Sequence, residues 1–99
     1  MSRVWFLYVL CCADGTLYTG ITTDPGNRLM VHNIGKGAKY TRARLPVEML
    51  IYVPVGDRSM ASKLEYRFKQ LSRKQKLVQV ECSLAGFLQQ QSNNVDKND

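Results

Sequence analysis

The sequence predicts a small α+β domain, in which a three-stranded, mainly antiparallel sheet is flanked by helices. Three observations lead to this fold class. Two apolar, β-rich runs lie close together near the start of the chain, a third lies in the middle, and a helical period of apolar residues follows the third. The chain has 99 residues, of which 44% are apolar, and this is enough for one hydrophobic core but not for two.

The first two strands form a β-hairpin. Residues Val4–Cys11 are continuously apolar, which is typical of a strand that is covered on both faces. The dipeptide Asp14-Gly15 indicates a turn, and Leu17–Thr22 supplies the second strand.

The rest of the domain is expected to consist of a helix, the third strand and a second helix, in that order. Asp24-Pro25 is an N-cap followed by proline in the first helical turn, and it predicts a helix to about residue 33 or 34. The third strand is Val47–Val55. A second helix follows, capped by Asp57 or Ser59 and running to about Ser72. Its apolar stripe consists of Ala61, Leu64, Phe68 and Leu71.

The end of the chain adds little apolar surface. A further short helix is expected over residues 73–81, and residues 84–88 are expected to pack only weakly. We therefore assign residues 1–82 to a single domain and residues 83–99 to a C-terminal extension. From about residue 89 this extension is expected to be disordered, because its polar residues have almost nothing to bury.

Positive charge is concentrated in the middle of the chain. The protein has 14 Lys and Arg against 8 Asp and Glu, which gives a net charge of +6. Twelve of the cations and three of the acids lie between Arg28 and Lys76, a window of net charge +9, and the remaining two cations and five acids sum to −3. This window favours a polyanionic partner such as nucleic acid. A basic face that serves only solubility is the alternative.

Cysteine use and hydropathy predict a cytoplasmic protein. Cys11 and Cys12 are adjacent and Cys82 is distant, so they form neither a disulfide framework nor a Cys-x-x-Cys metal pair. The apolar run after Arg3 is too short to span a membrane and continues directly into the hairpin. We therefore expect neither a signal peptide nor membrane insertion.

The first helix bears two residues that suit phosphate chemistry. Arg28 and His32 are four positions apart and so share one face of the helix. By the helical angle they lie opposite Leu29, Met30 and Ile34, and so are expected to point away from the buried side of their own helix. An exposed helix face with one chance arginine and one chance histidine is the alternative.

The second helix and the basic loop supply further candidates. Glu65 either binds a hard cation such as Mg²⁺ or forms an ordinary i,i+4 ion pair with Lys69. The loop over residues 35–44 alternates small residues with cations but lacks the Walker spacing of a P-loop. Its Tyr40 either stacks on a base or packs beneath the loop. The loop residues that we expect to bind nucleic acid are Lys36, Lys39, Tyr40 and Arg42.

Together these residues resemble the GIY-YIG nuclease superfamily. Leu-Tyr-Val-Leu around Tyr8 is followed by Tyr-Thr-Gly at Tyr18, and then by Arg28, His32 and Glu65 in the superfamily's order. The stretch H-N-x-G-K-G-A-K-Y-T-R resembles its small stand-alone bacterial proteins. Two positions depart from the motif names, because Phe-Leu-Tyr replaces Gly-Ile-Tyr and Thr replaces the Ile of Tyr-Ile-Gly. The resemblance covers about residues 4–79.

The resemblance implies a hydrolase, specifically a metal-dependent endonuclease that cleaves phosphodiester bonds. DNA is a more expected substrate than RNA, and DNA repair is the process in which such an activity is expected. It implies one Mg²⁺ or Mn²⁺ on Glu65 and charge neutralisation by Arg28. Tyr8 or Tyr18 would orient or deprotonate the attacking water, with His32 as proton acceptor. Gly20 is a structural residue of the second motif.

The same resemblance leaves other readings of the activity open. Without a separate sequence-reading domain, specificity would be low or would depend on substrate structure or on a protein partner. A nucleic-acid-binding module of the same fold with little turnover is the main alternative. A protein-interaction domain with a merely soluble basic face is a third possibility.

This mechanism requires Tyr8 and Tyr18 to reach one cleft. A two-residue hairpin loop would pair Tyr18 with Cys11 and place the tyrosines on opposite faces. A three-residue loop ending on a left-handed Gly15 pairs Tyr18 with Leu10 and makes the tyrosines diagonal neighbours. We therefore expect an odd-length loop or a bulge.

Overall fold

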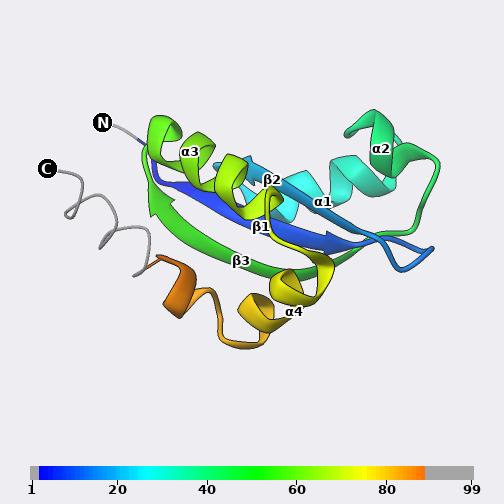
Figure 1. Ribbon diagram of the computed structural model, residues 1–99. Helices are drawn as coiled ribbons and strands as arrows, with labels where there is room; N and C mark the ends of the chain where they lie inside the picture. The colour runs from blue at the N-terminus through cyan, green and yellow to red at the C-terminus, as the bar shows by residue number, and fades with distance from the viewer. Residues whose placement is uncertain (1–2, 89–99) are drawn as a thin grey trace, which may run out of the picture.

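The computed structural model describes residues 3–88, which fold into a sheet with helices on both faces (Figure 1). The strands are β1 (Trp5–Cys11), β2 (Leu17–Thr22) and β3 (Glu48–Gly56), arranged in the order β2-β1-β3. Both neighbouring pairs are antiparallel. The predicted three-stranded α+β fold is therefore confirmed, with the continuously apolar β1 in the centre and β2 at one edge.

The hairpin has the three-residue loop that the one-cleft model requires. Tyr18 pairs with Leu10, and the amide of Cys12 donates to the carbonyl of Thr16 at 2.8 Å, so that residues 13–15 form the loop. Gly15 has a left-handed φ of 85°, which glycine adopts without a steric penalty. This register is the predicted one.

Capping side chains define where the first two long helices begin. Helix α1 spans Pro25–Asn33, and Asp24 caps it by accepting from a first-turn amide at 3.1 Å. Helix α3 spans Arg58–Lys69, and Asp57 caps it in the same way at 2.9 Å. Of the two caps that the sequence left open for α3, Asp57 is therefore the one used.

Helix α4 (Arg73–Glu81) explains why α3 ends earlier than the sequence predicts. Ser72 caps α4 through a capping box with Gln75 and so lies outside α3. The sequence predicts α4 correctly but assigns Ser72 to the preceding helix.

A four-residue helix, α2 (Lys39–Arg42), lies inside the basic loop and is absent from the sequence prediction. It is too short to produce an apolar period. Its Thr41 is fully buried, and Asn33 fixes the neighbouring chain by exchanging two hydrogen bonds with the backbone of Val47, at 3.0 and 2.7 Å. The basic loop is therefore an ordered part of the domain.

The two faces of the sheet have separate cores. On the face of Leu7 and Val9, helix α3 and the segment after α4 contribute Leu64, Phe68, Leu84 and Phe87. On the opposite face, Tyr8 and Leu10 cluster with Cys12, Val47 and the half-buried Leu29 of α1. Helices α3 and α1 therefore cover opposite faces of the sheet.

Residues 84–88 pack more closely than the sequence predicts. Leu84 is 0% and Phe87 4% exposed, and the Phe87 ring meets Phe68 edge-on with centroids 5.5 Å apart. Ser83 and Leu84 have left-handed φ values of 54° and 61°, which turn the chain after α4 back toward the sheet. The tail from residue 89, which we expect to be disordered, lies outside the described residues. Within residues 3–88 no helix has the length and hydropathy needed to cross a bilayer.

Candidate active site

Tyr8 extends from the central strand across the edge strand. It pairs with Gly20 of β2, and a Cβ built on Gly20 would lie 2.5 Å from the Tyr8 hydroxyl oxygen and 2.6 Å from Cζ. Such distances are far inside van der Waals contact, so only glycine leaves room for the phenol ring. Gly20 therefore has the structural role expected of it.

Helix α1 brings two polar side chains to the Tyr8 hydroxyl. That hydroxyl lies 2.9 Å from Nε2 of His32 and accepts a longer bond, of 3.4 Å, from Nε of Arg28. The predicted orientation of α1 is wrong: His32 is 0% exposed, whereas Met30 and Ile34 are 56% and 60% exposed. The imidazole is buried because both ring nitrogens are hydrogen-bonded, which apolar periodicity cannot reveal.

The hydrogen bonds of Thr41 determine the tautomer of His32. The Thr41 hydroxyl has one hydrogen and donates it to the carbonyl of Ala38 at 3.0 Å. It must therefore accept from Nδ1–H of His32, from which it lies 2.8 Å away. In the neutral ring the lone pair is then on Nε2, where it accepts the hydroxyl proton of Tyr8. A directed hydrogen-bond chain thus runs from Tyr8 through His32 and Thr41 to the backbone.

Burial keeps both ends of the Tyr8–His32 bond neutral. Burial raises the pKa of the Tyr8 phenol, against the lowering effect of the Arg28 hydrogen bond, and the charges of Tyr18 and Glu65 raise it further. Burial also lowers the pKa of His32, and the Arg28 charge lowers it further. The resting site therefore has a phenol donor facing an unprotonated imidazole acceptor.

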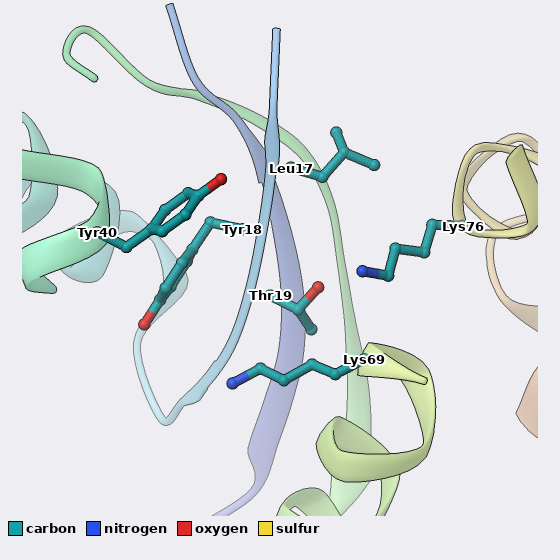
Figure 2. Close-up of a pocket in the computed structure, with 6 residues that line it drawn as sticks. All are labelled: Leu17, Tyr18, Thr19, Tyr40, Lys69 and Lys76. Carbon is teal, nitrogen blue, oxygen red and sulfur yellow. The ribbon is translucent and has the colours of Figure 1, made fainter. Parts of the chain in front are cut away.

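Tyr18 lies on the same sheet face as Tyr8, as predicted. Its ring centroid is 6.4 Å from that of Tyr8 and 5.3 Å from that of His32. Tyr40 of α2 stacks beside it, with centroids 6.0 Å apart and an interplanar angle of 26° (Figure 2). The Arg44 guanidinium lies 4.0 Å from the Tyr40 ring centroid. Tyr40 thus contacts both Tyr18 and Arg44, remains 40% exposed, and lines the pocket beside Tyr18.

Glu65 lies on α3, the helix that covers the opposite face of the sheet. Its Oε2 lies 3.4 Å from Nζ of Lys69, which is the i,i+4 ion pair that the sequence left as the alternative. Nζ of Lys69 is also 6.0 Å from the Tyr18 ring centroid. The charge of Glu65 raises the pKa of Tyr8, but less than burial and the charge of Tyr18 do.

Glu65 is a suitable ligand for Mg²⁺ or Mn²⁺ but not for a closed protein metal centre. Among residues 3–88 no three His, Cys, Asp or Glu side chains cluster closely enough to hold a metal. Mg²⁺ commonly keeps several waters and binds through one or two carboxylates together with substrate phosphates. The Glu65 side chain is 24% exposed, so its oxygens are accessible to such a hydrated ion once Lys69 moves aside.

The structure separates the sequence candidates into two groups. Tyr8, Tyr18, Arg28 and His32 meet at one place, with Gly20 beneath the Tyr8 ring, and the charge of Glu65 raises the pKa of Tyr8. The loop cations are exposed and do not line the pocket beside Tyr18; they are Lys36, Lys39 and Arg42.

Two residues of this site escape sequence reasoning. Thr41 orients His32, and Gly37 makes room for it, since a Cβ on Gly37 would come within 2.8 Å of Cγ of the imidazole. Both lie in the loop stretch that resembles the stand-alone bacterial proteins, and this was the only signal available for them.

A phenol, an imidazole and a guanidinium on one sheet face, near a carboxylate on the helix of the opposite face, define a domain of the GIY-YIG nuclease class. The model of the GIY-YIG catalytic domain matches residues 4–78. The chain therefore belongs to the GIY-YIG family, as the sequence indicates.

Relatives of the chain are small bacterial UPF0213 proteins. It is 53% identical to the one from Enterobacter sp. over 76 residues, which are 77% of this chain and 74% of that protein. It is 52% identical to the one from Desulfotalea psychrophila over 84 residues, covering 84% and 76% of the two chains.

Two solution NMR structures share the fold. The UPF0213 protein of Bacillus halodurans has a TM-score of 0.54 at 37% identity, covering 87% of this chain and 92% of that one. A protein from E. faecalis has a TM-score of 0.56 at 44% identity, covering 83% and 90%.

Proposed function

We propose that the protein is a divalent-metal-dependent endonuclease that hydrolyses phosphodiester bonds in nucleic acid, with DNA as the preferred substrate. Membership of the GIY-YIG family supports the reaction class. The observation that supports catalysis in this chain is the hydrogen-bond chain from Tyr8 to His32 and Thr41. In this proposal recognition depends on substrate structure or on a protein partner.

Tyr8 is the proton-transferring tyrosine in this proposal. Of the two candidate tyrosines, it is the one whose hydroxyl has a hydrogen-bonded proton acceptor within the described residues. As the phenol oxygen takes a proton from the attacking water, its own proton passes to Nε2 of His32. This concerted transfer avoids a free phenolate, which burial disfavours.

Arg28 has two roles in the proposal. Its long bond to the Tyr8 hydroxyl is easily exchanged, and its guanidinium neutralises charge that develops on a scissile phosphate. Tyr8 is only 1% exposed, so in this proposal the attacking water reaches its hydroxyl only after Arg28 has turned toward the phosphate. A Mg²⁺ or Mn²⁺ ion on Glu65 supplies Lewis-acid polarisation of that phosphate.

The test is a cleavage assay on purified protein. Branched, single-stranded and duplex DNA and RNA are incubated with Mg²⁺, Mn²⁺ or EDTA. Glu65→Ala, Arg28→Ala and Tyr8→Phe should each reduce metal-dependent cleavage about 100-fold or more, whereas Glu81→Ala, an exposed carboxylate on another helix, should not. Cleavage that survives Glu65→Ala would contradict the metal assignment.

A nucleic-acid-binding module with little turnover is the second candidate. The ion pair between Glu65 and Lys69 favours it, because the proposed metal ligand already has a cationic partner. This candidate predicts salt-sensitive binding without cleavage under every metal condition.

A further inference from the structure

A groove follows the open edge of β2 beyond the tyrosine cluster. One hollow of about 280 Å³ is lined by Leu17, Tyr18, Thr19, Tyr40, Lys69 and Lys76. A second, of about 200 Å³, is lined by Thr16, Leu17, Arg73 and Lys76. Leu17 and Lys76 line both hollows, so the two lie next to each other along β2, and we refer to them together as the groove; Figure 2 shows the first of them.

The groove exists because β2 is an edge strand. Successive side chains of a strand point to opposite faces, yet Tyr18 and Thr19 line the same hollow. The hollow therefore wraps around the strand edge, joining the tyrosine face to the face covered by α3. A ligand in it lies beside the catalytic cluster.

Cations from α3 and α4 enter the groove without enough acids to neutralise them. Lys76 is half-buried and points toward Thr19, and Lys69 extends beneath Thr19 toward the side of Tyr18 (Figure 2). No carboxylate of residues 3–88 forms an ion pair with Lys76, whereas Lys69 is paired with Glu65. Arg73 donates one hydrogen bond from its guanidinium to the carbonyl of Gly15, at 2.6 Å. Lys76 therefore presents an ammonium that no carboxylate of the described residues neutralises, and an anion bound in the groove can pair with it.

We propose that this groove is a phosphate-backbone subsite, in which Lys76 contacts a phosphate of the cleaved strand outside the scissile position. The inference rests on the proposed nuclease function and extends it. A phosphate contact positions a strand without reading its sequence. Helix α4 thereby sets how far the substrate must extend beyond the cut on that side.

The test compares Lys76→Ala with Lys74→Ala, a change of the same charge on the same helix at an exposed position that lines neither hollow. Binding of a fluorescent DNA oligonucleotide is measured by anisotropy in EDTA over a series of salt concentrations. Lys76→Ala should raise Kd about tenfold at low salt. It should also reduce the slope of log Kd against log salt by about 0.7–0.9, as expected for one lost phosphate contact. Lys74→Ala should leave both values near those of the unmodified protein.

A second measurement separates this inference from the proposed function. In Mg²⁺, Lys76→Ala should raise KM with little change in kcat, and Lys76→Arg should restore most of the loss. If the unmodified protein cleaves and Lys76→Ala matches Lys74→Ala, the groove proposal is wrong and the nuclease proposal stands. If the unmodified protein neither binds nor cleaves any nucleic acid, both are wrong.

Discussion

Replacing Gly20 by alanine tests how tightly the fold determines the position of the Tyr8 phenol. The new Cβ would lie 2.5 Å from the hydroxyl oxygen, 2.6 Å from Cζ and 2.9 Å from Cε2, where ordinary contact begins near 3.4 Å. The ring must therefore move by roughly 1 Å. Tyr8 has little freedom to do so, because it lies in the central strand and is 1% exposed.

The cost follows from these contacts. Overpacking a well-filled site costs about 1–3 kcal/mol, and losing the bond to His32 adds about 1 kcal/mol, so the free energy of unfolding should fall by about 2–4 kcal/mol. Urea unfolding followed by the fluorescence of Trp5, the single tryptophan, measures this. Cleavage should fall by about 100-fold or more, since the proposed proton transfer from Tyr8 to His32 depends on the same geometry.

Gly26→Ala is the matched control for this change. Its Cβ would meet nothing nearer than 3.9 Å, and alanine in the first turn of α1 should leave stability unchanged or raise it by up to about 1 kcal/mol. A Gly20→Ala protein that unfolds within about 0.5 kcal/mol of the unmodified protein would refute the reasoning, because the ring would then have moved without cost.

Four further predictions concern the hydrogen-bond chain and the core beneath α3. Thr41→Val should destabilise the protein by about 1–3 kcal/mol by leaving Nδ1–H of His32 unpaired, while Thr41→Ser should restore it, both measured by urea unfolding. Long-range ¹H–¹⁵N NMR of His32, the single histidine, should show the Nδ1–H tautomer, and an Nε2–H signal would contradict the assignment. Burial, and then the charge of Arg28, lower the pKa of His32, so the unfolded chain binds more protons than the folded one near pH 6.5. The free energy of unfolding should therefore fall as pH drops through about 6.5, and His32→Gln should lose this dependence. Equal pH dependence of the free energy of unfolding in the two proteins would disprove this. Phe87→Ala should cost about 3–5 kcal/mol and Val78→Ala, at a half-exposed position, much less, and equal losses would show that Phe87 is not a core residue.

Much of the fold can be predicted from the sequence because short-range chemistry determines it. The length of the loop ending at Gly15 sets the hairpin register, and this register places both tyrosines on one face. Asp24 and Asp57 determine where α1 and α3 begin. The apolar stripe of α3 faces the core as expected, since an apolar period is a direct record of burial.

The errors occur where burial does not follow hydrophobicity. His32 is the most buried residue of α1, but a hydrogen-bonded imidazole is indistinguishable in sequence from an exposed one. Thr41 reaches His32 because residues 39–42 fold into α2, and a helix of four residues is too short to show an apolar period in the sequence. Leu84 and Phe87 enter the core because the chain turns at Ser83 with a left-handed φ. This residue is not a glycine, so the sequence gives no sign of the turn.

Through the bond from Thr41 to Ala38, the four-residue helix α2 determines which nitrogen of His32 carries the proton. The Thr41 hydroxyl is committed to that carbonyl only while residues 38–41 keep their turn. If residues 38–41 left this turn, the hydroxyl would rotate freely and His32 would lose the constraint that keeps its proton on Nδ1. The tautomer of His32 therefore depends on a backbone turn that lies outside the helix carrying it.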